Sequence, residues 1–199
     1  GKRATSPRSL SAWVWSFAAT VDGPLAPDLI HHNVFFSSDP KAEFGPLGQG
    51  DMPEKPTLYI CAEDRSAGQV PKGPERFEII VNAPPNRPDK PKDHAECHAR
   101  TFQHLRQMGL SFSPEPGPAA LTTPAMLGRL FPGSGGAIYG RSPEGIFAAF
   151  ARPPARTQVA GLYLAGGGAH PGAGVPMAAL SGKHAAEAVL ADLKLGAPT

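Results

Sequence analysis

The sequence predicts a mixed α/β (α+β) fold, in which a mixed sheet is covered by helices and a separate strand–turn–helix follows at the C-terminal end. Short apolar runs rich in aromatic and β-branched residues recur through the first half of the 199 residues, which is typical of strands. The segment 94–108 repeats apolar residues at every third or fourth position, which is typical of an amphipathic helix. A glycine-rich turn near residue 170 leads into a second helical pattern.

Four segments of the first half have the composition of strands: 10–19, 33–37, 57–62 and 77–82. The connection between the last two contains two glycines and two prolines, so we expect a hairpin with a long loop or two neighbouring strands. A shorter run, 162–165, predicts a buried strand immediately before the glycine-rich turn.

Helices are predicted at 39–44, 94–108, 123–130 and 176–193. The first three follow side chains that can cap a helix, namely Asp39 (or Ser38), Asp93 and Thr123. Gly109 can end the second helix, and a proline at position 176 suits the first turn of the last one. The segment 45–55 is expected to be a loop.

Composition excludes some classes of protein. The formal net charge is +2, so no nucleic-acid partner is expected. The two cysteines, Cys61 and Cys97, are too few for a disulfide framework, which favours a reducing compartment. No apolar run reaches the roughly 20 residues that a membrane-spanning helix needs.

The strongest motif is the stretch from Gly161 to Gly182, where an apolar run ends in glycines and a helix begins soon after. Glycines let a backbone approach a ligand closely, and a helix start offers unpaired N–H groups that suit phosphate or an electron-rich ring edge. The stretch departs from the dinucleotide fingerprint G-x-G-x-x-G, because Met177 stands at the third glycine position and no acidic residue follows about 20 residues later. From the residues alone, a turn that merely reverses the chain is an equally good interpretation.

Two long segments carry a family resemblance. TPAMLGRLFPGSGGAIYG (123–140) and GLYLAGGGAHPGAGVPMAALSGKHAAEAVLADL (161–193) closely resemble the C-terminal end of the phytoene desaturase family of flavoproteins. Upstream, HHNVFFSSD (31–39), TLYICAEDR (57–65) and ERFEIIVNAPP (75–85) are similar to the same family. Within it, the chain most resembles the bacterial 1-hydroxycarotenoid 3,4-desaturases, also called methoxyneurosporene dehydrogenases. The resemblance covers nearly the whole chain.

The resemblance implies an FAD-dependent oxidoreductase of which this chain is the C-terminal part. Such enzymes bind FAD through an N-terminal Rossmann turn that is absent here, and their last strand–turn–helix returns to the flavin domain and closes the site. The residues implied to lie near the FAD ribityl chain, pyrophosphate or ring are Gly166, Gly167, Gly174, Val175, Pro176 and Met177. Related flavoproteins often carry an acidic residue just after the strand, where this chain continues with glycines, so the backbone is the expected contact.

The implied reaction removes two hydrogens from a C–C bond of an acyclic hydroxy- or methoxycarotenoid, and the flavin takes the hydride. The apolar residues expected to line the path of the polyene are Trp13, Trp15, Phe17, Ile138 and Phe147. Any one such residue is more often plain core than a substrate contact. No residue of the sequence is assigned as catalytic.

The implied organisation places residues 1–155 in a substrate-binding domain and 156–199 in the segment that returns to the Rossmann-like FAD domain. The expected partners are the carotenoid, the missing N-terminal FAD-binding half and, because carotenoids dissolve in bilayers, the cytoplasmic side of the inner membrane as a peripheral surface. The chain alone is expected to be inactive, since it lacks the half that holds the ADP moiety.

Two alternatives stay open. Another flavin enzyme, retinol-saturase-like or amine-oxidase-like, would combine the same motifs with a different substrate. A non-catalytic module that binds an apolar ligand or a protein partner belongs to a different class and would need no missing half.

The histidine spacing does not complete a metal site. His94 and His98 are one helical turn apart, a spacing that can bind zinc, but no second cluster of ligands follows and no metal is expected. His31 and His32 open a strand and are interpreted as structural. His170 lies inside the glycine-rich turn, where a place near a cofactor and an ordinary loop role are equal alternatives.

Overall fold

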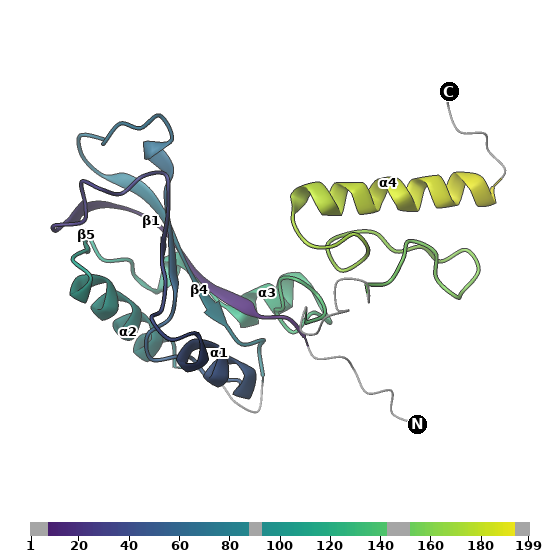
Figure 1. Cartoon of the computed structure of the whole chain (residues 1–199), viewed down its shortest axis with the longest axis horizontal. Coiled ribbons are helices and arrows are strands. Elements are labelled where there is room, and N and C mark those ends of the chain that lie inside the picture. The colour runs from purple at the N-terminus through teal and green to yellow at the C-terminus, as the bar shows by residue number, and fades with distance from the viewer. Residues whose placement is uncertain (1–7, 88–92, 143–151, 194–199) are drawn as a thin grey trace. The chain divides into compact units, whose positions relative to one another are not determined.

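The computed structural model describes residues 8–87, 93–142 and 152–193, and the chain divides into two compact units (Figure 1). The larger unit is Leu10–Ala137, and the smaller unit is Ile138–Thr199 together with Gly1–Ser9. The sheet belongs to the larger unit and the long helix α4 to the smaller one. The boundary expected at residue 155 concerns the domains of a longer protein and stays a prediction.

The sheet has the strand order β2-β3-β4-β1-β5, and β6 pairs with β1. The strands are β1 (Ser11–Asp22), β2 (His32–Phe35), β3 (Leu58–Ala62), β4 (Glu75–Ala83), β5 (Ser111–Ser113) and β6 (Leu121–Thr122). The mixed α/β class is confirmed. All pairings between these strands are antiparallel, where a mixed sheet was expected, because neighbours such as β3 and β4 are joined as a hairpin instead of by a crossover.

The long strand β1 has two different faces, because successive side chains of a strand point to opposite sides. Trp13, Trp15 and Phe17 share the face that packs against α2 (His94–Gln107), where the ring of Phe102 contacts both Trp15 and Phe17. The exposed residues of the opposite face are Ser16, Ala18, Thr20 and Asp22. The main hydrophobic cluster of the larger unit therefore lies on the side of the sheet that faces α2.

Helix α2 begins and ends where its sequence signals predict. The Asp93 carboxylate accepts hydrogen bonds from the backbone N–H groups of Ala95 (2.8 Å) and Glu96 (3.1 Å). At the other end, Gly109 has a φ of 90° and donates its N–H to the carbonyl of Arg106 at 3.0 Å. A left-handed residue of this kind satisfies carbonyls that the helix itself leaves unpaired.

Helix α1 spans Pro40–Gln49 and is longer than the sequence predicts, since 45–49 was expected to be loop. Pro46 removes one helical hydrogen bond, yet the helix continues to a left-handed cap at Gly50. Tertiary contacts are made by both halves of the helix. The buried carboxylate of Glu43 accepts hydrogen bonds from Thr57 (2.6 Å) and Asn82 (3.1 Å), and the side chain of Leu47 is buried.

The smaller unit contains α4 (Val175–Asp192) but, among its described residues, no strand at 162–165. Tyr163 forms only an isolated antiparallel bridge with Arg156, and this run is half exposed. The prediction of a buried strand there is wrong for this structure, because an apolar run becomes a strand only when neighbouring strands satisfy its backbone. None of the helices in the described ranges combines the length and hydrophobicity that a bilayer crossing requires.

Candidate functional site

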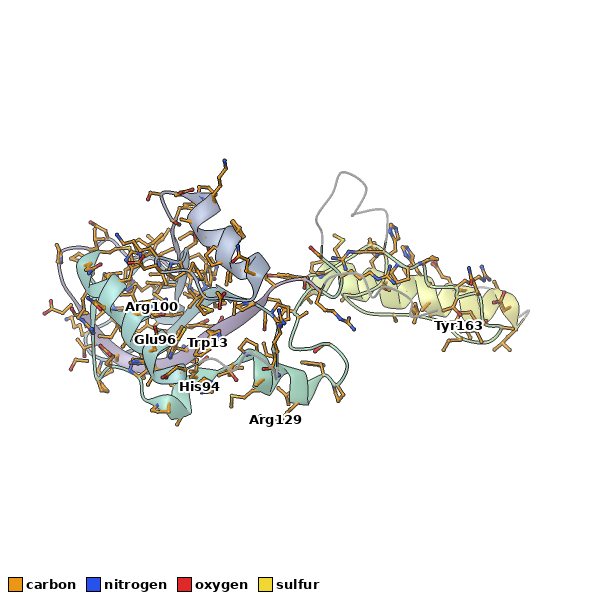
Figure 2. All side chains as sticks on the ribbon, turned by 90° about the horizontal axis from the view of Figure 1, so that it is seen from below. Trp13, His94, Glu96, Arg100, Arg129 and Tyr163 are labelled. Atoms are coloured by element: carbon orange, nitrogen blue, oxygen red, sulfur yellow. The ribbon has the colours of Figure 1, made fainter. Side chains whose placement is uncertain are left out.

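An apolar cavity of about 610 Å³ opens in the larger unit beside β1, α2 and α3 (Pro124–Leu130). Residues on its wall include Trp15, His94, His98, Leu121, Met126 and Arg129. Figure 2 shows His94 and Arg129 on the elements that border it. A cavity of this size with a mainly apolar wall is typical of a site for a small organic ligand.

The two histidines of α2 form part of this wall, whereas their spacing in the sequence was considered for a metal site and no metal was expected. His98 Nε2 lies 2.8 Å from the carbonyl oxygen of Pro116, so this nitrogen carries the proton and donates. The His98 ring stacks on Phe102, and the His94 ring meets Trp13 edge-on at 5.1 Å. Aromatic packing therefore holds both rings. The i, i+4 spacing of His94 and His98 places them on one face of α2, and this face borders the cavity.

The indole nitrogens of Trp13 and Trp15 are buried, and within the described part of the chain neither has a hydrogen-bond partner. A buried N–H without an acceptor costs about 1–3 kcal/mol. Trp15 also lines the apolar cavity.

A second cavity, of about 320 Å³, has a different chemical character. Its wall includes Asp93, Glu96 and Arg100 of the α2 region. Glu96 and Arg100 form an ion pair across one turn of that helix (Figure 2). Charged walls make this cavity a poor place for a long apolar ligand, so the apolar cavity is the better candidate.

The residues predicted to line a polyene path fall in different places. Trp15 lies on the wall of the apolar cavity, and Trp13 is two residues away on the same face of β1. Phe17 packs in the core against Phe77 and Phe112. Ile138 belongs to the smaller unit and is 42% exposed, and Phe147 lies outside the described residues. The structure brings Trp13 and Trp15 together beside the cavity, and a substrate contact for any of the five stays a prediction.

The glycine-rich turn adopts backbone conformations that need glycine. Gly166 has a φ of 111° and Gly174 a φ of 99°, values that side-chain-bearing residues rarely adopt. Gly174 is the N-cap of α4, and among the described residues no side chain caps that helix. Pro176 occupies the first turn, as predicted, and the first free N–H groups, those of Val175 and Met177, have no acceptor within the helix.

An arginine holds the turn in shape. Arg152 Nη1 donates to the carbonyl of Gly167 at 2.7 Å and approaches the carbonyl of Tyr139 at 3.3 Å. His170 donates its backbone N–H to the Pro153 carbonyl at 2.9 Å. The turn is therefore tied by side-chain and backbone hydrogen bonds to the segments around residues 139 and 153.

The turn fits a phosphate or the edge of an electron-rich ring. A Cβ atom placed on Gly166 or Gly174 would meet no heavy atom of the described structure within 4 Å, so both glycines border open space. Val175, at the helix start, is 85% exposed. An uncapped helix N-terminus beside open space offers N–H groups and the positive end of a dipole to a ligand. Val175, Pro176 and Met177 at the helix start have apolar side chains, so the donors presented there are backbone N–H groups.

Comparison with known proteins identifies the family. The model of the flavin containing amine oxidoreductase family matches residues 33–190, so the chain belongs to that family. It is 66% identical over 187 residues to a hydroxyneurosporene desaturase of Cereibacter sphaeroides and 63% identical over 190 residues to one of Rhodobacter capsulatus. It is also 30% identical over 168 residues to a 1-hydroxycarotenoid 3,4-desaturase of a Flavobacterium species.

The matched region is a limited part of each relative. The alignments cover 94%, 94% and 82% of this chain, but only 37%, 38% and 34% of the three relatives. The chain therefore spans slightly more than a third of their length. A longer protein of this kind would contain a large part that the present sequence does not include.

Proposed function

We propose that this chain is the C-terminal part of an FAD-dependent carotenoid desaturase that introduces C=C bonds into an acyclic hydroxy- or methoxycarotenoid. The identity of 66% to a hydroxyneurosporene desaturase over 94% of the chain carries this proposal. The apolar cavity beside Trp15 supports it, because a polyene is long, apolar and uncharged. A bound flavin would accept one hydrogen of the C–C bond as a hydride, and the second hydrogen would leave as a proton.

The glycine-rich turn and the start of α4 have a defined task in this proposal. The N–H groups of Val175 and Met177 would bind the pyrophosphate, ribityl chain or ring edge of FAD, and Gly166, Gly167 and Gly174 would let the cofactor come close. Arg152 would keep the turn in place through its hydrogen bond to Gly167. Exposure of Val175 and Met177, at 85% and 43%, is consistent with a surface that a cofactor or the rest of the protein covers.

The wall of the apolar cavity favours a carotenoid over an amine. An amine substrate is a cation at neutral pH and calls for a carboxylate or an aromatic cage. Among the described residues that line the cavity there is no Asp or Glu, and Arg129 adds a positive charge. An amine-oxidase-like substrate is therefore disfavoured, and product analysis with candidate polyenes and amines separates the two.

The complete enzyme tests this function. Expression of the full reading frame should yield a protein with a flavin absorption spectrum that converts a hydroxy- or methoxycarotenoid to a product with one more double bond. A full-length protein that contains no flavin would overturn the proposal. Titration of the 199-residue chain with FAD should show no tight binding, since the half that holds the ADP moiety is missing.

We also propose a location for the complete enzyme. Carotenoids partition into bilayers, so we place the enzyme on the cytoplasmic side of the inner membrane as a peripheral protein. Fractionation of cells that express the full reading frame should find it with the membranes and release it under mild conditions. Recovery in the soluble fraction, with activity undiminished by removal of membranes, would contradict this location.

A further inference from the structure

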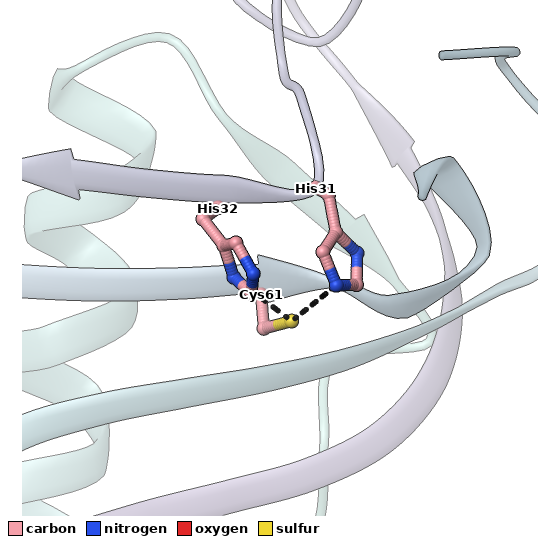
Figure 3. Close-up of side chains that lie close together, drawn as sticks. All are labelled: His31, His32 and Cys61. Carbon is pink, nitrogen blue, oxygen red and sulfur yellow. Dashed lines mark hydrogen bonds between the residues drawn. The ribbon is translucent and has the colours of Figure 1, made fainter. Parts of the chain in front are cut away.

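Two histidines and a cysteine that are distant in sequence meet at the edge of the sheet. Strand β2 pairs with β3 so that His32 lies directly opposite Cys61, and His31 immediately precedes it. Figure 3 shows the His31 and His32 rings on either side of the Cys61 sulfur. Sequence spacing did not reveal this cluster, because His32 and Cys61 are 29 residues apart and only the strand register joins them.

The distances within the cluster match those between ligands of one tetrahedral metal ion. Cys61 Sγ lies 3.7 Å from His32 Nδ1 and 4.0 Å from His31 Nε2. All three ligand atoms lie within 4.8 Å of one another. With Zn–S near 2.3 Å and Zn–N near 2.05 Å, tetrahedral geometry places S and N about 3.6 Å apart. Small side-chain movements would therefore bring the three atoms onto one ion.

The hydrogen bond of His31 prepares its ring for binding. His31 Nδ1 lies 3.0 Å from the carbonyl oxygen of Ala62, so Nδ1 carries the proton and Nε2 directs its lone pair toward the sulfur. Metal-binding histidines commonly donate their second nitrogen to a backbone carbonyl in this way. The hydroxyl of Tyr59 lies 2.8 Å from His32 Nδ1, the nitrogen that also faces the sulfur. This nitrogen has one lone pair, so a bound ion would displace the Tyr59 hydroxyl from it.

A carboxylate side chain lies on the same face of the sheet as the sulfur. Glu78 is the partner of Cys61 in the β3–β4 register, so the two side chains project from the same face. A divalent cation at the cluster would be attracted by this carboxylate and would stabilise Cys61 as a thiolate.

We propose that His31, His32 and Cys61 bind one Zn²⁺ ion, with a water molecule as the fourth ligand. Thiolate and imidazole ligands in this number suit Zn²⁺. The ion would cross-link β2, an edge strand of only four residues, to β3 and so stabilise the edge of the sheet. The proposal does not depend on the flavin or on the carotenoid.

Spectroscopy with Co²⁺ in place of Zn²⁺ tests the site directly on the purified protein. One equivalent of Co²⁺ should produce a thiolate-to-cobalt charge-transfer band, and one equivalent of Zn²⁺ should remove it. Cys61→Ser should abolish the band. Cys97→Ser is the matched control, because Cys97 is the other buried thiol and belongs to α2, so this variant should keep the band at full intensity.

The Zn²⁺ affinities of two histidine variants provide a second test. This test does not depend on whether the Cys61→Ser variant folds. His31→Asn and His32→Asn should each weaken Zn²⁺ binding at least about 100-fold in a competition with a chelating dye, since loss of a ligand exceeds the 10- to 100-fold effect of outer-shell changes. Circular dichroism checks that each variant is folded. The absence of a charge-transfer band in the wild-type protein, or its equal loss in Cys97→Ser, would overturn the proposal.

Discussion

Arg65 and Glu75 form a doubly hydrogen-bonded ion pair that is almost completely buried. Arg65 Nε lies 2.7 Å from Glu75 Oε2, and Nη2 lies 2.6 Å from Oε1, with both side chains at most 3% exposed. Arg65 Nη1 also donates to the carbonyls of Ala26 (2.8 Å) and Leu29 (2.9 Å). The guanidinium thus joins the start of β4 to the connection between β1 and β2, the connection that leads into the proposed metal site.

Replacing one partner of this pair should destabilise the larger unit strongly. Glu75→Gln leaves a buried guanidinium without a counter-charge, and we expect a loss of about 3–5 kcal/mol in the free energy of unfolding. Urea denaturation measures it. Asp64→Asn is the control, because the Asp64–Arg76 ion pair is exposed and its loss should matter far less. Equal losses in the two variants would contradict a special role for the buried pair.

Gly136 should tolerate no larger residue. Its φ is 77°, and an added Cβ would lie 2.1 Å from the carbonyl oxygen of Pro124 at the start of α3. Gly136→Ala is expected to cost about 1–3 kcal/mol from overpacking in addition to about 1–2 kcal/mol for the left-handed backbone. Gly135→Ala meets no heavy atom within 4 Å and should show only the backbone cost, so thermal denaturation should rank Gly135→Ala as the more stable variant.

Filling the apolar cavity should impair the proposed reaction. Ala125 lines the cavity on α3, and Ala125→Phe would occupy part of the space for a polyene. In the complete enzyme we expect kcat/KM for the carotenoid to fall about 10- to 200-fold, the range for a poor steric fit in an apolar pocket. Leu130→Phe, at an exposed position of the same helix, is the control. Unchanged kinetics in Ala125→Phe would place the carotenoid elsewhere.

Stability of the larger unit should depend on pH through His104. Burial, and to a smaller extent Lys55, lower the pKa of His104, and its Nδ1 has no hydrogen-bond partner among the described residues. The unfolded chain takes up this proton near pH 6.5, while the folded state resists it. Stability should therefore fall as the pH drops below about 6.5, until the folded pKa is passed. His104→Gln should flatten this dependence in urea titrations between about pH 7.5 and 5.5, and an unchanged slope would assign the effect to another group.

Local signals were sufficient for much of the larger unit. Asp93 and Gly109 mark the ends of α2 because capping depends on neighbouring residues alone. The hairpin of β3 and β4 follows from two apolar runs separated by glycine and proline. The continuation of α1 past residue 44 could not be predicted, since Pro46 stands inside the helix and the burial of Leu47 depends on the fold.

The other differences between the sequence-based predictions and the structure involve residues whose role depends on partners far away in the sequence. The run 162–165 has the composition of a strand, but a strand also needs a neighbour, and the described part of the chain supplies only the single bridge at Tyr163. The cluster of His31, His32 and Cys61 requires the β2–β3 register, which a single sequence does not determine. His94 and His98 were correctly placed on one helix face, but the cavity beside that face depends on α3 and β1.

The two faces of β1 should also differ in how fast their residues are substituted during evolution. Trp13 and Trp15, at 1% and 0% exposure, are held by the rings packed around them, so a change at either position would require several compensating changes. Ser16, Ala18 and Thr20 on the other face meet no such requirement within the described structure. In an evolving lineage, substitutions should therefore accumulate at alternate positions of this strand, and their rate along β1 should rise and fall with a period of two residues.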